Sequence, residues 1–192
     1  MNLFSIVALL LLGVSPALAH VGHGATVSFA AGLAHPLGGL DHVAVMVAVG
    51  LWAALKGGRA LWLWPVTFVG VMLVGGALGM AHVPVPFVEP AILASIVALG
   101  LMVALAVDMP AALGAVIVGG FALFHGHAHG SEVTENIGGF GYMAGFAAAT
   151  AALHLTGIGF ARLMTRADMR PVIRAAGAVC VVIGGALYAG VV

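Results

Sequence analysis

The sequence predicts an all-α, polytopic membrane protein: a bundle of six transmembrane helices that follows a cleaved signal peptide. Hydrophobic residues make up 63% of the 192 residues and charged residues only 6%, against about 25% in soluble domains. The mean hydropathy is +1.22. The apolar residues after the signal peptide form six runs, each near the roughly 20 residues that a helix needs to cross a bilayer. We therefore expect these helices to lie in the lipid bilayer.

Residues 1–19 have the pattern of a secretory signal peptide. An apolar core is followed by a small-large-small ending at Ala19, although no Lys or Arg precedes the core. The alternative is an uncleaved first span. Cleavage after Ala19 would leave His20 as the mature N-terminus, close to His23, where the two imidazoles could collect a divalent ion on the outer side.

Six apolar spans separated by short loops form one transmembrane domain over residues 20–192. Their expected limits are 34–55, 61–80, 88–107, 110–125, 137–160 and 172–192. All six Lys and Arg residues fall around the connections after the first and the fifth span. By the positive-inside rule these connections are cytoplasmic, which puts the mature N-terminus and most histidines on the periplasmic side of a bacterial inner membrane.

The first span opens with four potential metal ligands, in the run His-Pro-Leu-Gly-Gly-Leu-Asp-His-Val-Ala-Val-Met. On helical spacing His35, His42 and Met46 lie near one face, with Asp41 to the side. Pro36 and the two glycines after it disfavour an uninterrupted helix. The segment that carries His35 is therefore expected to be unwound or kinked and to fold back on His42.

These donors suit a late first-row divalent ion better than calcium or magnesium, which take oxygen ligands. The alternative is a helix start capped by Asp41, with two histidines at a helix interface. Ionisable groups inside an apolar segment are costly and usually functional. That cost favours a metal site.

A second donor group closes the fourth span, in the run Phe-His-Gly-His-Ala-His-Gly-Ser-Glu over residues 124–132. His125 and His129 share a face if the helix continues, and His127 joins them if the chain is extended. Glu132 lies nearby. The alternative is a hydrophilic periplasmic loop. A zinc hydrolase is disfavoured because the run lacks a His-Glu-x-x-His motif.

Two further polar residues are weaker candidates. Glu89 begins the third span, as a ligand or as a residue that stabilises the positive end of that helix. His154 lies deep in the fifth span, where packing or a role for an ion leaving the site are the alternatives. Gly75 and Gly79 are four residues apart, a spacing that lets transmembrane helices approach closely.

Composition excludes several function classes. The formal net charge is zero, so no basic patch predicts a nucleic-acid partner. The single cysteine, Cys180, excludes an intrachain disulfide or Cys-x-x-Cys pair. The one lysine, Lys56, is not part of a Walker A motif, so ATP cannot drive transport from this polypeptide. Membrane hydroxylases need more histidines, on the cytoplasmic side. We therefore expect no enzyme activity, no catalytic residues and no prosthetic group.

The two motifs resemble those of the HupE/UreJ family of nickel permeases. The first has the form HPxxGxDHxxxM, and its fixed positions are His35, Pro36, Gly39, Asp41, His42 and Met46. The second is the run over residues 124–132, and the likeness extends through Glu89 and Ser95 across essentially the whole chain. The resemblance implies Ni²⁺ uptake across the inner membrane for hydrogenase or urease maturation, with downstream maturation proteins as partners.

From the residues alone, the expectation is broader: a divalent-metal transporter with an outer binding site. Cobalt or zinc as the cargo, or a membrane metal sensor that does not transport, are the alternatives, and a homo-oligomer is compatible with each. An inward divalent ion gains about 4.6 kcal/mol per 100 mV of membrane potential, roughly a thousandfold accumulation. Facilitated uptake driven by the potential is therefore sufficient.

Overall fold

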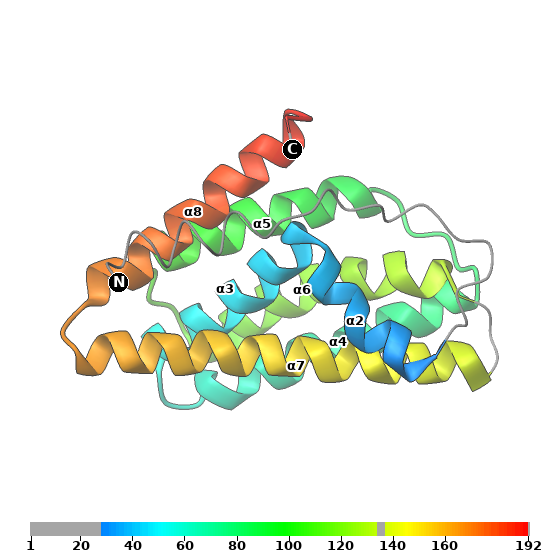
Figure 1. Cartoon of the computed structure of the whole chain (residues 1–192), viewed down its shortest axis with the longest axis horizontal. Coiled ribbons are helices and arrows are strands. Elements are labelled where there is room, and N and C mark those ends of the chain that lie inside the picture. The colour runs from blue at the N-terminus through cyan, green and yellow to red at the C-terminus, as the bar shows by residue number, and fades with distance from the viewer. Residues whose placement is uncertain (1–27, 134–136, 192) are drawn as a thin grey trace.

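A computed structural model describes residues 28–133 and 137–191, which form seven helices and no strand (Figure 1). Their bounds are α2 Phe29–Gly38, α3 Leu40–Lys56, α4 Ala60–Met80, α5 Val88–Ala104, α6 Ala111–Ser131, α7 Ile137–Arg166 and α8 Arg170–Tyr188. The signal peptide expected over residues 1–19, with His20 and His23, lies outside the described residues. The all-α class is confirmed.

Several of these helices are long and apolar enough to cross a membrane, as a multi-pass membrane protein requires. Four helices, α4, α6, α7 and α8, qualify singly, and α2 with α3 qualifies as one bent span. Helix α5 is apolar but has only 17 residues, fewer than the roughly 20 that span a bilayer. Four spans are thus supported among the described residues, or five if the bent pair crosses as one span. Six spans stay a prediction.

The segment expected as one span over residues 34–55 consists of two helices that meet at an angle of 87°. Helix α2 contains Pro36, and Gly39 between the helices is extended, with φ −115° and ψ 126°. A β-carbon at Gly39 would collide with the Asp41 carboxylate and lie 2.8 Å from Nδ1 of His42. A side chain at residue 39 would therefore displace the side chains of Asp41 and His42.

Helices α4 and α6 approach closely along facing glycines. A β-carbon added at Gly126 would collide with the carbonyl oxygen of Met72, and one at Gly75 would collide with that of Leu123. A β-carbon at Gly79 would likewise collide with the carbonyl of His127. The spacing of Gly75 and Gly79, from which we expected only a compact bundle, thus lies at a close helix contact, and this contact fixes the rotation of α6 about its own axis.

Helix α7 packs against both halves of the broken span. Gly145 of α7 leaves no room for a β-carbon beside the carbonyl of Phe29 in α2, and Gly157 leaves none beside that of Val47 in α3. Helices α5 and α8 pack together on the other side of the bundle (Figure 1). Helix α3 is therefore enclosed within the bundle, whereas α2 packs against α7 on one side and leaves Phe29, Leu33 and Leu37 exposed.

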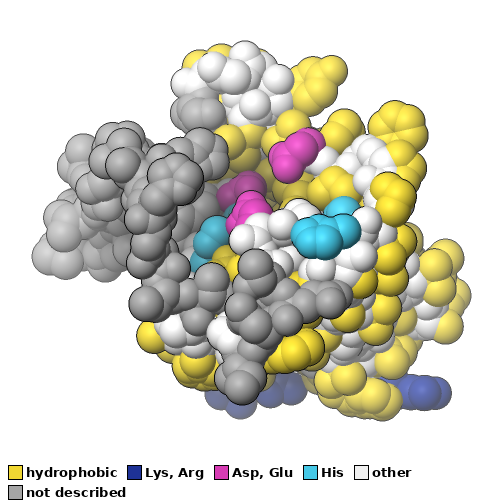
Figure 2. Space-filling view, turned by 90° about the vertical axis from the view of Figure 1, so that its right-hand side faces the viewer, with side chains coloured by type: hydrophobic (Ala, Val, Ile, Leu, Met, Phe, Trp, Pro, Cys, Tyr) yellow, Lys and Arg dark blue, Asp and Glu magenta, His cyan; other side chains and the backbone are white. Residues whose placement is uncertain are grey.

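The two ends of the bundle differ in charge. The basic residues lie near one end, where Lys56 at the end of α3 pairs with Asp108. Figure 2 looks onto the opposite end, where acidic and histidine side chains gather, and Lys and Arg side chains are visible only along the lower edge. This segregation agrees with the pattern expected from the sequence. Which end faces the periplasm stays a prediction.

The glycine contacts between α4 and α6 give a test of this packing. We expect Gly126→Val to lower the thermal stability of the purified protein strongly, because overpacking of this kind costs about 1–3 kcal/mol or more. Gly120→Val in the same helix is the matched control, because a β-carbon at Gly120 has no neighbour within 4 Å. Equal unfolding midpoints for the two variants in detergent would contradict the close packing.

Candidate metal centre

Three imidazoles from three helices converge at the bend of the broken span. His35 of α2, His42 of α3 and His129 of α6 each offer a ring nitrogen, and the three nitrogens lie within 4.8 Å of one another. The His129 ring centroid is 4.6 Å from that of His35 and from that of His42. His42 and His129 are only 7% and 5% exposed. We call these three residues the histidine cluster.

Asp41 fixes the orientation of the His42 ring. Nδ1 of His42 lies 2.7 Å from Oδ1 of Asp41, and because a carboxylate only accepts, Nδ1 is the donor. In a neutral imidazole the lone pair is then on Nε2, which faces the cluster. This arrangement of carboxylate, histidine and free ring nitrogen is the one that orients histidine ligands in metal sites.

Nε2 of His42 faces Nε2 of His129 at 2.5 Å. Nδ1 of His129 lies 3.5 Å from Oε2 of Glu132, an ion-pair distance at the long limit of a hydrogen bond. If each Nδ1 holds its ring proton toward a carboxylate, two lone pairs face each other across the cluster. A proton shared by the two Nε2 atoms removes that repulsion, and a metal ion would do the same once the two rings move apart.

Glu132 follows the last residue of α6 and supplies a second carboxylate. Its interaction with the His129 imidazole lowers the pKa of the Glu132 carboxyl below its ordinary value, so this carboxylate is ionised at neutral pH. With Asp41 it gives the cluster two carboxylates beside three imidazoles. A divalent cation would balance that charge.

His125 lies one helical turn before His129 and is completely buried. Its Nε2 is 3.0 Å from the hydroxyl of Ser95, which donates its only hydrogen to the carbonyl of Ile92 at 2.6 Å. His125 must therefore donate from Nε2. Its Nδ1 then carries a lone pair with no partner among the described residues, at a ring distance of 5.8 Å from His42.

Two aromatic rings pack against the histidine cluster, and neither residue was among the candidates predicted from the sequence. Phe146 of α7 has its ring centroid 4.7 Å from that of His129, and Tyr142, one turn earlier, lies 5.8 Å from His35. Both residues are buried. Their four-residue spacing marks one face of a helix, but nothing in the sequence assigns that face to the histidines.

The structure does not bring all the candidate ligands into the histidine cluster. Met46 is fully buried in the apolar core. Glu89 is exposed in the first turn of α5. His127 lies on another face of α6, where its Nε2 donates to the carbonyl of Val83 at 2.8 Å. The helical alternative for residues 124–132 is the one observed, with His125 and His129 on a shared face.

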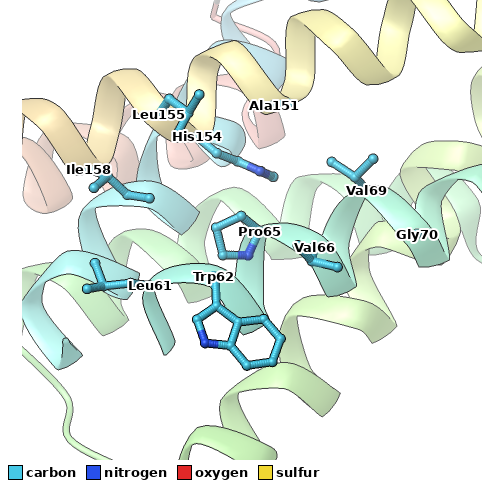
Figure 3. A pocket seen from close by; sticks show the side chains of 10 residues that line it. All are labelled: Leu61, Trp62, Pro65, Val66, Val69, Gly70, Ala151, His154, Leu155 and Ile158. Atoms are coloured by element: carbon cyan, nitrogen blue, oxygen red, sulfur yellow. The ribbon is translucent and has the colours of Figure 1, made fainter. Parts of the chain in front are cut away.

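His154 lies apart from the cluster, at a fully buried position on α7. Neither of its ring nitrogens has a partner among the described residues. It lines a largely apolar cavity of about 490 Å³ between α4 and α7, and Figure 3 shows its ring between α7 and the α4 residues Pro65 and Val69. Its ring centroid is 5.1 Å from that of Phe68, which lies 5.9 Å from His125. The ring of Phe68 thus contacts both imidazoles.

Comparison with known proteins gives two matches. A family model described as HupE / UreJ protein matches residues 7–187. The Protein HupE of Rhizobium leguminosarum bv. viciae is 47% identical over 172 residues, which cover 90% of each chain. No solved structure matches the chain.

The geometry predicts how Asp41 affects metal affinity. Asp41→Asn keeps an oxygen that can accept from Nδ1 of His42 but removes the negative charge. We expect the affinity of the purified protein for Ni²⁺, measured by calorimetry, to fall about tenfold to a hundredfold. His127→Ala is the control, because that ring is bonded to Val83 and outside the cluster. Unchanged affinity in Asp41→Asn would contradict the assignment.

Proposed function

We propose that this chain, which belongs to the HupE/UreJ family, is a permease that admits Ni²⁺ across the inner membrane to supply a nickel enzyme such as hydrogenase or urease. The observation that carries the proposal is the convergence of His35, His42 and His129 at one end of a bundle of apolar helices. The proposal contains no catalytic step. The donors bind a cation and release it.

Charge balance supports a divalent cation as the cargo. Moving an ion out of water into a medium of low dielectric constant is prohibitive unless nearby groups replace its water and offset its charge. Asp41 and Glu132 supply two negative charges, and the imidazoles supply uncharged nitrogens. The ion and its surroundings are together neutral, so the ion can leave water at the cluster without a large electrostatic penalty.

Distances support binding by the imidazoles directly. Histidine nitrogens lie about 2.0–2.1 Å from a bound first-row metal such as zinc, so two nitrogens on opposite sides of an ion are about 4 Å apart. The three nitrogens of the cluster lie within 4.8 Å of one another. The Nε2 atoms of His42 and His129 are 2.5 Å apart, which is closer than two ligands of one ion can be. Small rotations that separate these two rings and bring in the half-buried His35 would place all three nitrogens at ligand distance.

The donor set favours late divalent ions, and family membership supports nickel among them. Nitrogen sites bind divalent ions in the order Mn²⁺ < Fe²⁺ < Co²⁺ < Ni²⁺ < Cu²⁺ > Zn²⁺, so such a site prefers Ni²⁺ to Co²⁺ but does not exclude Cu²⁺ by affinity. Competition among these ions during uptake tests the choice. If the cells take up Co²⁺ in preference to Ni²⁺, cobalt is the substrate in place of nickel.

The membrane potential is a sufficient driving force for this transport. Two charges moving inward gain about 4.6 kcal/mol per 100 mV, which is roughly a thousandfold in concentration. His125 is positioned to receive an ion from the cluster, because its unpartnered Nδ1 is buried and its ring is 5.8 Å from that of His42. Deeper still, His154 is the next imidazole with unpartnered nitrogens.

The function is tested by uptake of radioactive nickel in cells that lack their own nickel and cobalt carriers. We expect His35→Ala, Asp41→Asn and His42→Ala each to abolish uptake at normal abundance in the membrane, because each removes a donor or a charge that replaces the ion's water. His127→Ala should have a mild effect. Near-normal uptake by Asp41→Asn would remove this motif from the transport site.

A second experiment separates a permease from a membrane sensor that only binds metal. Wild-type protein in proteoliposomes should admit Ni²⁺ when an inside-negative potential is imposed, and dissipation of the potential should reduce the accumulated nickel. Binding of Ni²⁺ by the purified protein without flux into the vesicles would support the sensor instead.

A further inference from the structure

The end of the bundle opposite the histidine cluster contains a recess of about 380 Å³. It lies between the end of α3, the connection from α5 to α6, and the start of α8. Three of its lining residues are basic, namely Lys56, Arg170 and Arg174, and one is acidic, Asp108. Apolar side chains, including Leu55 and Val107, form the rest of its wall.

Side chains from α3 and α8 hold the shape of this recess. The indole nitrogen of Trp52 donates to the carbonyl of Val107 at 2.9 Å. Nε of Arg174 donates to the carbonyl of Ala104 at 2.7 Å. The turn between these carbonyls passes through Ala106, whose φ of 50° is in the left-handed region. The end of α5 is thus bonded to α8, and the connection that follows it is bonded to α3.

The recess carries an excess of positive charge. Lys56 pairs with Asp108, so the one carboxylate is neutralised. Arg174 uses Nε for its bond to Ala104, which leaves its two terminal amino groups free to donate. Arg170 is exposed, and its side chain has no ion pair or hydrogen bond within the described part of the chain. Two guanidinium groups therefore face the recess without a counter-charge.

We propose that this recess binds the phosphate group of an anionic phospholipid. Guanidinium groups bind phosphate oxygens in pairs, and basic pockets between transmembrane helices are suited to lipid headgroups. The recess lies where apolar helices end, which is the depth of the headgroups. Its apolar wall, with Leu55 and Pro171, would contact the glycerol and the first methylene groups. A free phosphate ion would make no use of that wall.

The test compares lipids retained by the full-length protein in native mass spectrometry. The protein in detergent is offered equal amounts of a phosphatidylglycerol and a phosphatidylcholine with the same acyl chains. We expect the wild type to retain the anionic lipid preferentially. The preference should fall roughly tenfold or more in the Arg170→Gln, Arg174→Gln double variant, from the loss of two basic contacts.

The matched control is the Arg162→Gln, Arg166→Gln double variant. These two arginines lie on α7 near the same end of the bundle but do not line the recess. This variant should keep the preference for phosphatidylglycerol. If the first double variant does not accumulate, Arg170→Gln alone should still reduce the preference severalfold, because it breaks no bond within the described structure.

Three results would overturn the proposal. The first is equal retention of the two lipids by the wild type. The second is an equal loss of preference in both double variants, which would assign the effect to net charge and not to the recess. The third is displacement of the retained phosphatidylglycerol by millimolar inorganic phosphate, which would make the recess a site for free phosphate.

Discussion

The interruption of the first apolar segment at Gly39 decides where the metal donors lie. An extended glycine between α2 and α3 turns the chain by 87°, so His35 comes back over His42 instead of lying farther along one straight helix. The side chains of Asp41 and His42 occupy the space that a β-carbon at Gly39 would need. A side chain at residue 39 would therefore disturb the donors directly, because it would push against both of these side chains.

The rest of the bundle completes the cluster that this break begins. Facing glycines on α4 and α6 bring the two helices close enough to fix the rotation of α6, which directs His125 and His129 inward and His127 outward. Phe146 then covers the imidazoles from α7. The resulting site has nitrogen lone pairs inside, two carboxylates beside them and apolar walls around them. In apolar surroundings an unpaired polar atom raises the free energy of the folded protein. A cation bound by these nitrogens would remove that penalty.

Local chemistry explains which features could be predicted from the sequence. The break follows from Pro36 and the glycines after it, and the shared face of His125 and His129 follows from helical spacing, so both were predictable. The positions of Met46 and His127 could not be predicted, because they depend on how the helices rotate against one another. The shortness of α5 and the approach of Phe146 and Tyr142 also depend on tertiary packing. The ligand set itself stays a prediction.

X-ray absorption at the nickel edge, on purified protein loaded with one equivalent of Ni²⁺, tests the central claim most directly. The account predicts a first shell of nitrogen and oxygen only, with the multiple scattering of about three imidazoles, and the loss of one imidazole in His129→Ala. A sulfur ligand from Met46 would contradict the account, because the structure buries that side chain in the core. An imidazole signal unchanged by His129→Ala would contradict it equally.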